Sequence, residues 1–598
     1  MERSNNITLK IIDILCFILY KIFMKKIITI IMMAFVMVNM FFVATNAAET
    51  DTVIKVEYES EVKEFNVFED GWNYAMERAK EGKDVYVTLL TDWKAEDGQF
   101  TKDFINGPGF DYDTIYFADD VKMTLDLNGF TIDRGLTSAE LNGEVIFIND
   151  DANVTIKNGT ITGGYSSNGA GGIHMEDAIV HLENLVFTNN RVRNDDGAAL
   201  QHNDGGELYM KNCRFENNDC ENKGFDIYGT VYLDDVDKVY IEDCYFSSND
   251  GIDYGAGIYL NDCAYTEIKN CTFENLYAND RGGAIWASGN YENHILDIVG
   301  CKFLNNSAGN WAGAIYAELL LFNIYDSEFK GNSAEWSGGA IYYTGTNAHQ
   351  GRIDSYIYRS TFDGNYAGWD AGAIYCNGNM MTTGIYSYGC TFINNRAEGS
   401  GGAVYCETEC KFALFSDENG DPAIVKNNVA GEDGGGIYSP STQGISGYIH
   451  IGGEVYVSGN TSANGNDDLY ISSSSGLSIH EITSPAGSIG VRSSDDESGS
   501  VGRFVEGVEI NIDSFFINNE GFEVGYKIYT SSSTENHYLM LVEIPSHAGS
   551  IFGEGSFVSI ISLLALIASI TSFGIGFVLY KKVIPVLATE EESNEDNE

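Results

Sequence analysis

Positive charge is scarce in this chain. Its 598 residues include 35 Lys and Arg against 87 Asp and Glu, which gives a formal net charge of −52 and a pI near 4.3. A protein this acidic repels phosphate backbones and anionic headgroups, so the composition argues against nucleic acid or anionic lipid as a partner. It favours a soluble extracellular segment that attracts divalent cations.

Motifs for catalysis are also missing. The nine histidines are scattered without a paired context, and there is no nucleophile elbow, zinc-type His pair or phosphate loop. Acidic pairs with oxygen ligands for Ca²⁺ occur at Asp195-Asp196, Asp234-Asp235 and Asp467-Asp468, but none matches the EF-hand loop. Solvated turns are the simpler interpretation of these pairs. We therefore predict no catalytic residue and no resident cofactor, with Ca²⁺ at these acidic pairs as the weaker alternative.

Helical periodicity is the third absence, and it extends from about residue 120 to 475. This stretch instead repeats a Phe-x-x-Asn followed by a small-residue cluster that runs into Ile-Tyr. One copy reads Cys301-Lys-Phe303-Leu-Asn-Asn306 and continues to Ala312-Gly-Ala-Ile-Tyr316. The repeated phenylalanines are Phe187, Phe215, Phe246, Phe273, Phe303, Phe329, Phe362 and Phe392. Their period of about 30 residues indicates a repeat architecture.

Each repeat is expected to form short strands. Apolar residues alternate within it, as in Cys390-Thr-Phe392-Ile, and the runs end in residues that accept turn conformations. Two or three strands per repeat predict one coil of a parallel β-solenoid, with coils stacked at roughly 4.8 Å. Ten such coils would make a rod on the order of 50 Å long.

Stacking turns each repeat position into a ladder of equivalent side chains. Phe is expected inside, with the residue two positions earlier: Cys213, Cys244, Cys271, Cys301, Ser327, Ser360 and Cys390. We expect these thiols to be small apolar fillers and not disulfides, because stacked parallel side chains are poorly directed for bridging. The Asn three residues after Phe is expected at a corner, where its amide joins coils and the backbone adopts αL, with a break at Leu276.

The aromatic residue of the Ile-Tyr pair is expected to face outward. The residues directly before and after it are apolar or small and are expected to face the core, and side chains alternate along a strand. The resulting column comprises Tyr259, Trp286, Tyr316, Tyr342, Tyr375, Tyr405 and Tyr438. An exposed aromatic column suits sugar rings or a partner surface, so these residues are the predicted binding site. The alternative is that the rings only stabilise the outer face of the sheet through mutual contact.

The N-terminus predicts export. A signal peptide is expected from Met24, with Lys25 and Lys26, an apolar run and a cleavage site at Thr45-Asn-Ala47. Residues 1–23 would then precede the true start; the alternative is a genuine second apolar segment.

Near the C-terminus, residues 556–580 contain no charge and are long enough to cross a bilayer. Lys581 and Lys582 follow, which places the acidic tail in the cytoplasm and the ectodomain outside the cell. The sequence thus predicts a single-pass cell-membrane protein whose membrane partner is contacted through this helix. A buried core helix is the alternative.

One clear helix pattern lies before the repeats, at Phe65–Gly82, with apolar Phe68, Trp72, Ala75, Met76 and Ala79. It is expected to cap the first coil, since an open end of a solenoid invites aggregation. The predicted organisation is an N-terminal extension and signal peptide at 1–47, the cap at 48–118, repeats at 119–475, a C-terminal β-rich cap or stalk at 476–555, the transmembrane helix at 556–580 and the tail at 581–598.

The paired half-motifs resemble the repeat of the chlamydial polymorphic outer membrane proteins. Phe-x-x-Asn and Gly-Gly-Ala-[Ile/Leu/Val] recur in order over about residues 170–470. The resemblance implies an all-β ectodomain, a right-handed parallel β-helix of the pectin-lyase-like type, and an adhesin-like role at a cell surface. Those proteins end in a translocation domain, whereas the predicted transmembrane helix stands here, so their secretion route is not carried over.

The expected function is therefore an adhesin-like surface protein that binds glycans or glycoproteins. The pectin-lyase-like fold also hosts polysaccharide lyases and hydrolases, but the polygalacturonase-type signature of Asn-Thr-Asp, Gly-His-Gly and Arg-Ile-Lys is absent. Fold alone does not decide activity. A structural spacer without a ligand and a polysaccharide-active enzyme are the two alternatives.

Overall fold

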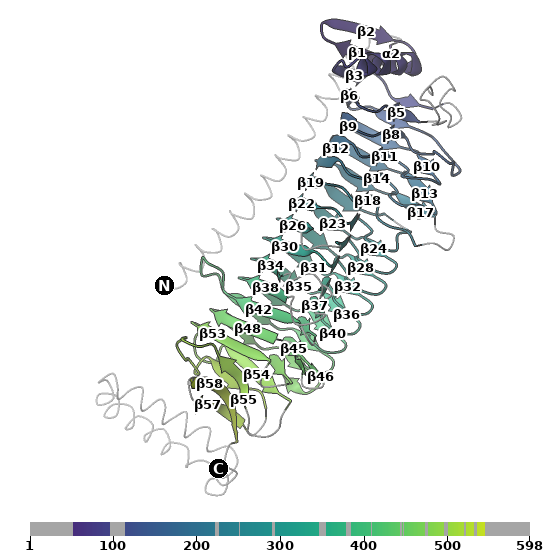
Figure 1. The fold of residues 1–598 in the computed structure, drawn as a ribbon. Helices are drawn as coiled ribbons and strands as arrows, with labels where there is room; N and C mark the ends of the chain where they lie inside the picture. Colours follow the sequence, from purple (N-terminus) through teal and green to yellow (C-terminus); the bar gives the residue numbers. More distant parts are fainter. Residues whose placement is uncertain are drawn as a thin grey trace, which may run out of the picture.

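The computed structural model describes residues 52–95, 114–221, 226–249, 251–289, 294–345, 354–377, 384–407, 410–442, 445–446, 448–472, 476–494, 500–519, 522–530 and 535–543. They form a long rod of stacked coils with a cap at each end (Figure 1). The predicted signal peptide, the predicted transmembrane helix at 556–580 and the tail lie outside these residues. Among the residues described, no helix is long and apolar enough to span a bilayer.

The N-terminal cap contains the predicted helix. α2 (Phe68–Lys80) follows a hairpin of β1 (Ile54–Tyr58) and β2 (Glu61–Phe65), and the five predicted apolar residues of the helix are buried. Trp72 of α2 packs edge-on against Phe117, with ring centroids 4.9 Å apart. Because β1 also pairs antiparallel with the first solenoid strand, the cap covers the edge at which the parallel ladder begins.

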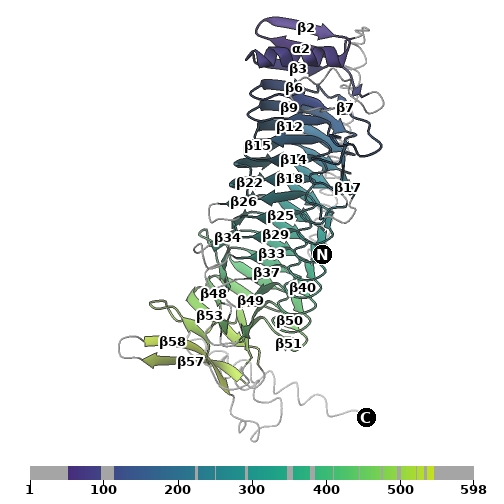
Figure 2. The ribbon, with the colours of Figure 1, turned by 45° about the vertical axis from the view of Figure 1, so that its right-hand side comes forward.

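Three ladders of parallel strands run along the rod (Figure 2). The first comprises β3 (Val85–Leu89), β6 (Lys122–Asp126), β9 (Asn153–Thr162), β12 (Ile179–Thr188), β15 (Glu207–Lys211), β19 (Lys238–Glu242), β22 (Tyr265–Lys269), β26 (Ile295–Val299), β30 (Leu321–Tyr325), β34 (Asp354–Tyr358), β38 (Gly384–Tyr388), β42 (Lys411–Phe415), β48 (Tyr448–Gly453), β53 (Leu477–Ile482) and β55 (Ser500–Phe504).

The second ladder carries the repeated phenylalanines. It comprises β4 (Trp93–Lys94), β7 (Thr131–Asp133), the second halves of β9 and β12, β16 (Arg214–Glu216), β20 (Tyr245–Ser247), β23 (Thr272–Glu274), β27 (Lys302–Leu304), β31 (Glu328–Lys330), β35 (Thr361–Asp363), β39 (Thr391–Ile393), β43 (Ala423–Lys426), β49 (Val455–Ser458) and β54 (Ile489–Ser493).

The third ladder carries the Ile-Tyr pairs. It comprises β5 (Ile115–Phe117), β8 (Ile146–Ile148), β11 (Ile173–Glu176), β14 (Leu200–Asn203), β18 (Val231–Asp234), β21 (Ile258–Asn261), β25 (Ile285–Ser288), β29 (Ile315–Glu318), β33 (Ile341–Thr344), β37 (Ile374–Asn377), β41 (Val404–Cys406), β45 (Ile437–Ser439), β52 (Leu469–Ile471) and, after β54, β56 (Phe515–Ile517). The predicted all-β, right-handed parallel solenoid is confirmed.

Short strands line the turns between the second and third ladders. They are β10 (Tyr165–Ser166), β13 (Arg191–Arg193) and β17 (Asp219–Glu221), then β24 (Tyr277–Ala278), β28 (Ser307–Ala308), β32 (Ser333–Ala334), β36 (Tyr366–Ala367), β40 (Arg396–Ala397), β44 (Val429–Ala430), β50 (Thr461–Ser462) and β51 (Gly465–Asn466). A small hairpin, β46 (Ser441–Thr442) with β47 (Ile445–Ser446), projects from the third ladder.

The core follows the predicted alternation. All eight repeated phenylalanines are fully buried, and their rings stack from coil to coil with centroids 4.7–5.0 Å apart. A parallel ladder brings equivalent residues to about this separation. Each coil therefore buries its ring against the rings of its two neighbours.

The buried Cys and Ser column is more than the apolar filling that the sequence predicts. The backbone N–H of Cys213 donates to the sulfur of Cys244 at 3.4 Å, and that of Cys301 donates to the Ser327 hydroxyl at 3.1 Å. The same contact repeats along the column as far as Cys390. Sulfur and hydroxyl both accept hydrogen bonds, which explains why serine replaces cysteine at two of the coils.

The asparagine ladder joins the coils as predicted. Asn332, for example, donates from Nδ2 to the Phe303 carbonyl and to Asn365 Oδ1, each at 3.0 Å. Its own Oδ1 accepts from the backbone N–H and Nδ2 of Asn306. The αL residue is the one before the ladder, such as Asn305 at φ +53°, and not the ladder asparagine that the sequence favours for it.

The ladder ends on a carboxylate and breaks at one coil. Asn460 donates from its backbone N–H and from Nδ2 to Asp468 Oδ1, so this buried acid closes the row. At the predicted break, Leu276 offers no oxygen, and the buried Nδ2 of Asn249 has no hydrogen-bond partner. An unpaired buried donor of this kind costs about 1–3 kcal/mol.

The solenoid continues past residue 475, where the sequence predicts its end. β54 pairs in parallel with β52, and β56 with β54. A late copy of the motif, Phe516-Ile-Asn-Asn519, supports this last coil, because Asn519 bonds both the N–H and the carbonyl of Ser493. The antiparallel hairpin of β57 (Phe522–Thr530) and β58 (Glu535–Glu543) then caps the rod, with β58 also paired to β55.

One disulfide joins Cys376 to Cys410, 34 residues apart. Neither cysteine belongs to the column before the phenylalanines, where the sequence predicts free thiols. The cysteines of that column are indeed free and buried.

Replacing Leu276 by Asn is expected to complete the asparagine ladder. The new amide would accept from Asn249, which relieves the orphaned donor and adds bonds of about 1 kcal/mol each. Together these gains exceed the roughly 2 kcal/mol of leucine burial that is lost. We expect a higher urea midpoint for L276N, followed by circular dichroism. The urea midpoint of the control L304N, a position outside the ladder, should not increase. A urea midpoint for L276N below that of the parent protein would contradict this role of the ladder.

Glu144 makes stability depend on pH. Its side chain is buried, and burial raises its pKa to about 7 in spite of Arg134 and the Ser166 hydroxyl nearby. Because this folded-state pKa lies above the unfolded value, the folded state holds the proton more tightly, and stability falls as pH rises from about 4.5 to 7. We expect E144Q to remove roughly 3 kcal/mol of that decline. Urea unfolding at several pH values measures this decline in unfolding free energy. The control Glu183→Gln, at an exposed position, should show the same decline as the parent. An equal decline in E144Q would refute the role of Glu144.

Candidate functional site

The predicted aromatic column is present on the outer side of the third ladder. Tyr259 and Trp286 lie 4.3 Å apart between ring centroids and are parallel within 3°, and the stacking continues through Tyr316, Tyr342, Tyr375 and Tyr405. Tyr405 and Tyr438 are tilted by 44°. The column also includes a ring before it and one after it, Tyr232 and Tyr470.

The column is less exposed than the sequence predicts. Tyr259 and Tyr316 are buried, at 8% and 5% exposure, and the other five predicted residues are half-buried. Stacking at the coil spacing makes each ring cover the faces of its neighbours. The Arg281 guanidinium lies 5.3 Å from the Tyr316 ring and covers it further. Inside the column the ring faces therefore lie against one another, which is the arrangement that the stabilising alternative describes.

Open aromatic faces lie beside the column, in a row that the sequence does not single out. This tryptophan row consists of Trp311, Trp336 and Trp369, in the turns before β29, β33 and β37. The ring centroid of Trp311 lies 6.0 Å from that of Tyr342 in the column and 5.2 Å from that of Trp336, which it meets edge-on. The rings of Trp336 and Trp369 are stacked, with centroids 5.2 Å apart and planes 14° from parallel. Trp336 is 41% exposed and Trp369 60%.

The tryptophan row ends at Trp369 because glycine follows it in the next coil. The N–H of Gly399 donates to the Trp369 carbonyl at 2.7 Å, so the two residues occupy successive coils. A β-carbon on Gly399 would lie 2.5 Å from Asp370 Oδ1, so a side chain there would displace this carboxylate, which accepts the N–H of Ser400. The outer face of Trp369 is thus not covered by a ring from the next coil. At the other end of the row, Arg281 lies 4.5 Å from the Trp311 ring and covers it.

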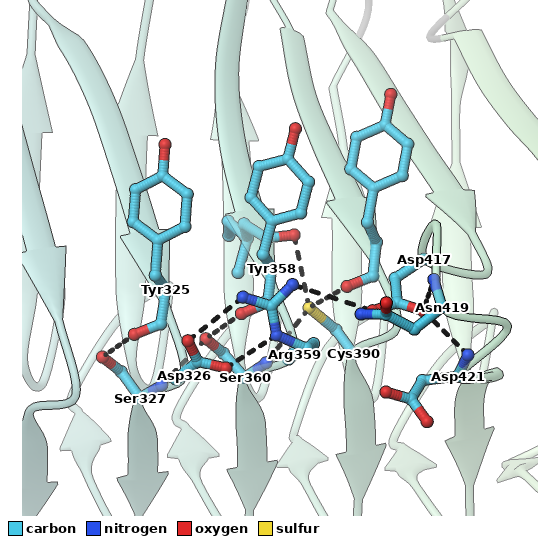
Figure 3. Close-up of polar contacts among 12 residues, drawn as sticks. Tyr325, Asp326, Ser327, Tyr358, Arg359, Ser360, Cys390, Asp417, Asn419 and Asp421 are labelled. Atoms are coloured by element: carbon cyan, nitrogen blue, oxygen red, sulfur yellow. Dashed lines mark hydrogen bonds and ion pairs between the residues drawn. The ribbon is translucent and has the colours of Figure 1, made fainter.

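A second aromatic column stands on the first ladder. This tyrosine column consists of Tyr325, Tyr358, Tyr388 and Phe415, the last residues of β30, β34, β38 and β42. Successive centroids are 5.3, 5.0 and 5.5 Å apart. Figure 3 shows the rings of Tyr325 and Tyr358 parallel, with both hydroxyls pointing the same way. All four residues are half-buried.

Arg359 anchors the turns below this column (Figure 3). It adopts φ +46°, a left-handed conformation unusual for a bulky residue and taken by Asp326 and Gly389 in the adjacent coils. Its guanidinium donates to both carboxylate oxygens of Asp326, at 2.8 and 3.1 Å, and lies 3.7 Å from Asp417. Asp417 in turn accepts the N–H groups of Asn419 and Asp421. These contacts fix the turns of three coils against one another.

The acidic pairs considered for Ca²⁺ serve the fold. Asp467 and Asp468 are buried, and Asp467 accepts the N–H of Gly434 while Asp468 closes the asparagine ladder. Asp196 accepts the N–H of Tyr228, and Asp234 accepts from Asn261. In the part of the chain that the structure describes, no group of three or more His, Cys, Asp or Glu is arranged to hold a metal ion.

The sequence contains a signal for the tyrosine column, whereas the tryptophan row is harder to find. An aromatic residue recurs four positions before the repeated phenylalanine, as in Tyr325-Asp-Ser-Glu-Phe329 and Tyr358-Arg-Ser-Thr-Phe362. The tryptophans vary in position by one residue relative to the following Ile-Tyr pair, which hides them in a search at fixed spacing.

Comparisons with known proteins agree with this architecture. The family model described as the right handed beta helix region matches residues 139–362, and the Chlamydia polymorphic membrane protein repeat matches residues 389–407. No curated protein and no solved structure matches the chain. The resemblance seen in the sequence is therefore confirmed, and the two matches indicate a surface-type β-helix protein.

Proposed function

We propose that this protein is an adhesin-like cell-surface protein that binds glycans or glycoproteins through the tryptophan row. In this proposal the solenoid is extracellular, one transmembrane helix at 556–580 anchors it, and the C-terminus is cytoplasmic. The observation that carries the proposal is the open face of Trp369 beside the exposed Trp336. A flat aromatic face accepts the apolar face of a pyranose ring, and exposed aromatic patches of this kind are typical of interaction sites.

We place the contact on the tryptophan row and not on the predicted aromatic column. The rings from Tyr259 to Tyr438 cover each other, so their contribution is to stabilise the third ladder. The tryptophan row offers the free face, and because Trp369 is 60% exposed we expect its truncation to leave the fold intact. The proposed role is binding without catalysis.

The charge of the protein constrains the partner. A net charge of −52 repels nucleic acid and acidic polymers, whereas neutral glycans meet no such barrier. Neutral glycan chains on a cell or on a glycoprotein are thus the favoured ligands.

A glycan and glycoprotein array probed with the full chain in detergent tests the proposal. We expect binding that drops at least tenfold in the double variant W336A/W369A, because the open face is lost. The matched control is Y277A, which removes another exposed aromatic, at 44% exposure, from the same side of the rod. Y316A should lower thermal stability and leave affinity intact. Binding that survives W336A/W369A contradicts the proposal, and an array without any binding would favour a structural spacer.

A further inference from the structure

The tyrosine column ends at two consecutive glycines. In the register of β42 and β48, Phe415 pairs with Gly452, so the next coil supplies no ring to continue the column. A β-carbon on Gly452 would lie 2.8 Å from the Phe415 ring, and one on Gly453 would lie 2.0 Å from the Ser416 hydroxyl oxygen. At Gly453, φ is +76°, a left-handed conformation that favours glycine. The Phe415 ring and the His480 β-carbon fill the space above Gly452, and no side chain of this coil continues the tyrosine column.

A shallow hollow of about 540 Å³, open to solvent, lies beside these residues on the surface of the rod. Tyr388 and Phe415 form its apolar side, and Ser416, His480, Glu481 and Thr483 contribute its polar groups. Because the hollow is open to solvent, a ligand would be contacted on one side, by aromatic rings and by a few polar groups that fix its orientation. The hollow lies on the first ladder, whereas the tryptophan row precedes strands of the third ladder.

The polar groups of the hollow suit hydroxyl groups. The His480 ring meets Phe415 edge-on, with centroids 5.1 Å apart, and its Nε2 lies 3.1 Å from Nδ1 of His450. Burial lowers the pKa of His480, so the imidazole is neutral at pH 7. Glu481 is exposed at the rim and accepts hydrogen bonds, and the Ser416 and Thr483 hydroxyls both donate and accept. No Lys or Arg lines the hollow to balance an anionic ligand.

We propose that this hollow is a second carbohydrate site, which binds one or two terminal pyranose units of a neutral glycan. The inference rests on the proposed glycan-binding function but uses none of the residues assigned to it. Phe415 and Tyr388 contact the apolar face of the sugar, and Glu481, Ser416 and Thr483 bond its hydroxyls. Uronic and sialic acids are excluded by the Glu481 carboxylate and by the net charge of −52.

The test measures disaccharide binding to the full chain in detergent by isothermal titration calorimetry. The probes are cellobiose, maltose, lactose and N,N′-diacetylchitobiose, with digalacturonic acid as the charged comparison. We expect at least one neutral probe to bind at least tenfold more tightly than digalacturonic acid. Thr483→Trp places a large side chain in the hollow from an exposed position, and it should lower the affinity for that probe at least tenfold.

A charge variant keeps the test independent of folding. E481Q preserves the size of an exposed side chain and removes its charge. It should lower the ratio of the affinity for the neutral disaccharide to that for digalacturonic acid at least threefold. The exposed control E506Q should leave this ratio unchanged. W336A/W369A should keep the disaccharide affinity, so a failure of the tryptophan row and a failure of the hollow give different results. The proposal is overturned if no neutral probe binds, if Thr483→Trp binds as the parent does, or if digalacturonic acid binds as tightly as the neutral probes.

Discussion

Coil-on-coil stacking in register is the constraint on which this structure depends. In a parallel ladder every residue has its equivalent about 4.8 Å away in the next coil. Each position therefore needs a side chain that packs against, or forms hydrogen bonds with, the same position in the next coil. Asparagine does so by donating to and accepting from the neighbouring asparagines. Phenylalanine does so by offset stacking, and cysteine or serine by accepting a backbone N–H.

The same constraint determines where binding is chemically feasible. A column of identical aromatics covers its own ring faces, so a long outward column is a structural element. Faces become available where the next coil lacks a ring, and among the described residues glycine has this effect beside Trp369 and Phe415. Gly399 leaves the face of Trp369 open, and Gly452 leaves the hollow beside Phe415. Function on this rod is thus expected at interruptions of the repeat.

The sequence predicts the fold well because its signals are periodic. Phe187 to Phe392, the ladder asparagines and the helix around Trp72 are where the patterns place them. The exposure of Tyr259 and Tyr316 is not predictable from alternation, since alternation gives the direction of a side chain and not what covers it. The hollow at Gly452 depends on the register of β42 and β48, and the hairpin of β46 and β47 interrupts the regular coil between them. The Cys376–Cys410 disulfide joins β37 to the residue before β42 and has no repeated spacing, so no periodic signal predicts it.

The ladder of asparagines is the most direct place to test this account. Asn332 is fully buried and takes part in four side-chain hydrogen bonds between coils, whereas Asn279 makes one bond at the surface. Urea unfolding of the full chain, followed by circular dichroism, should show a loss of about 3 kcal/mol or more for N332A and about 0.5 kcal/mol for N279A. Equal, small losses in the two variants would contradict the claim that satisfied stacking between identical positions holds the solenoid together.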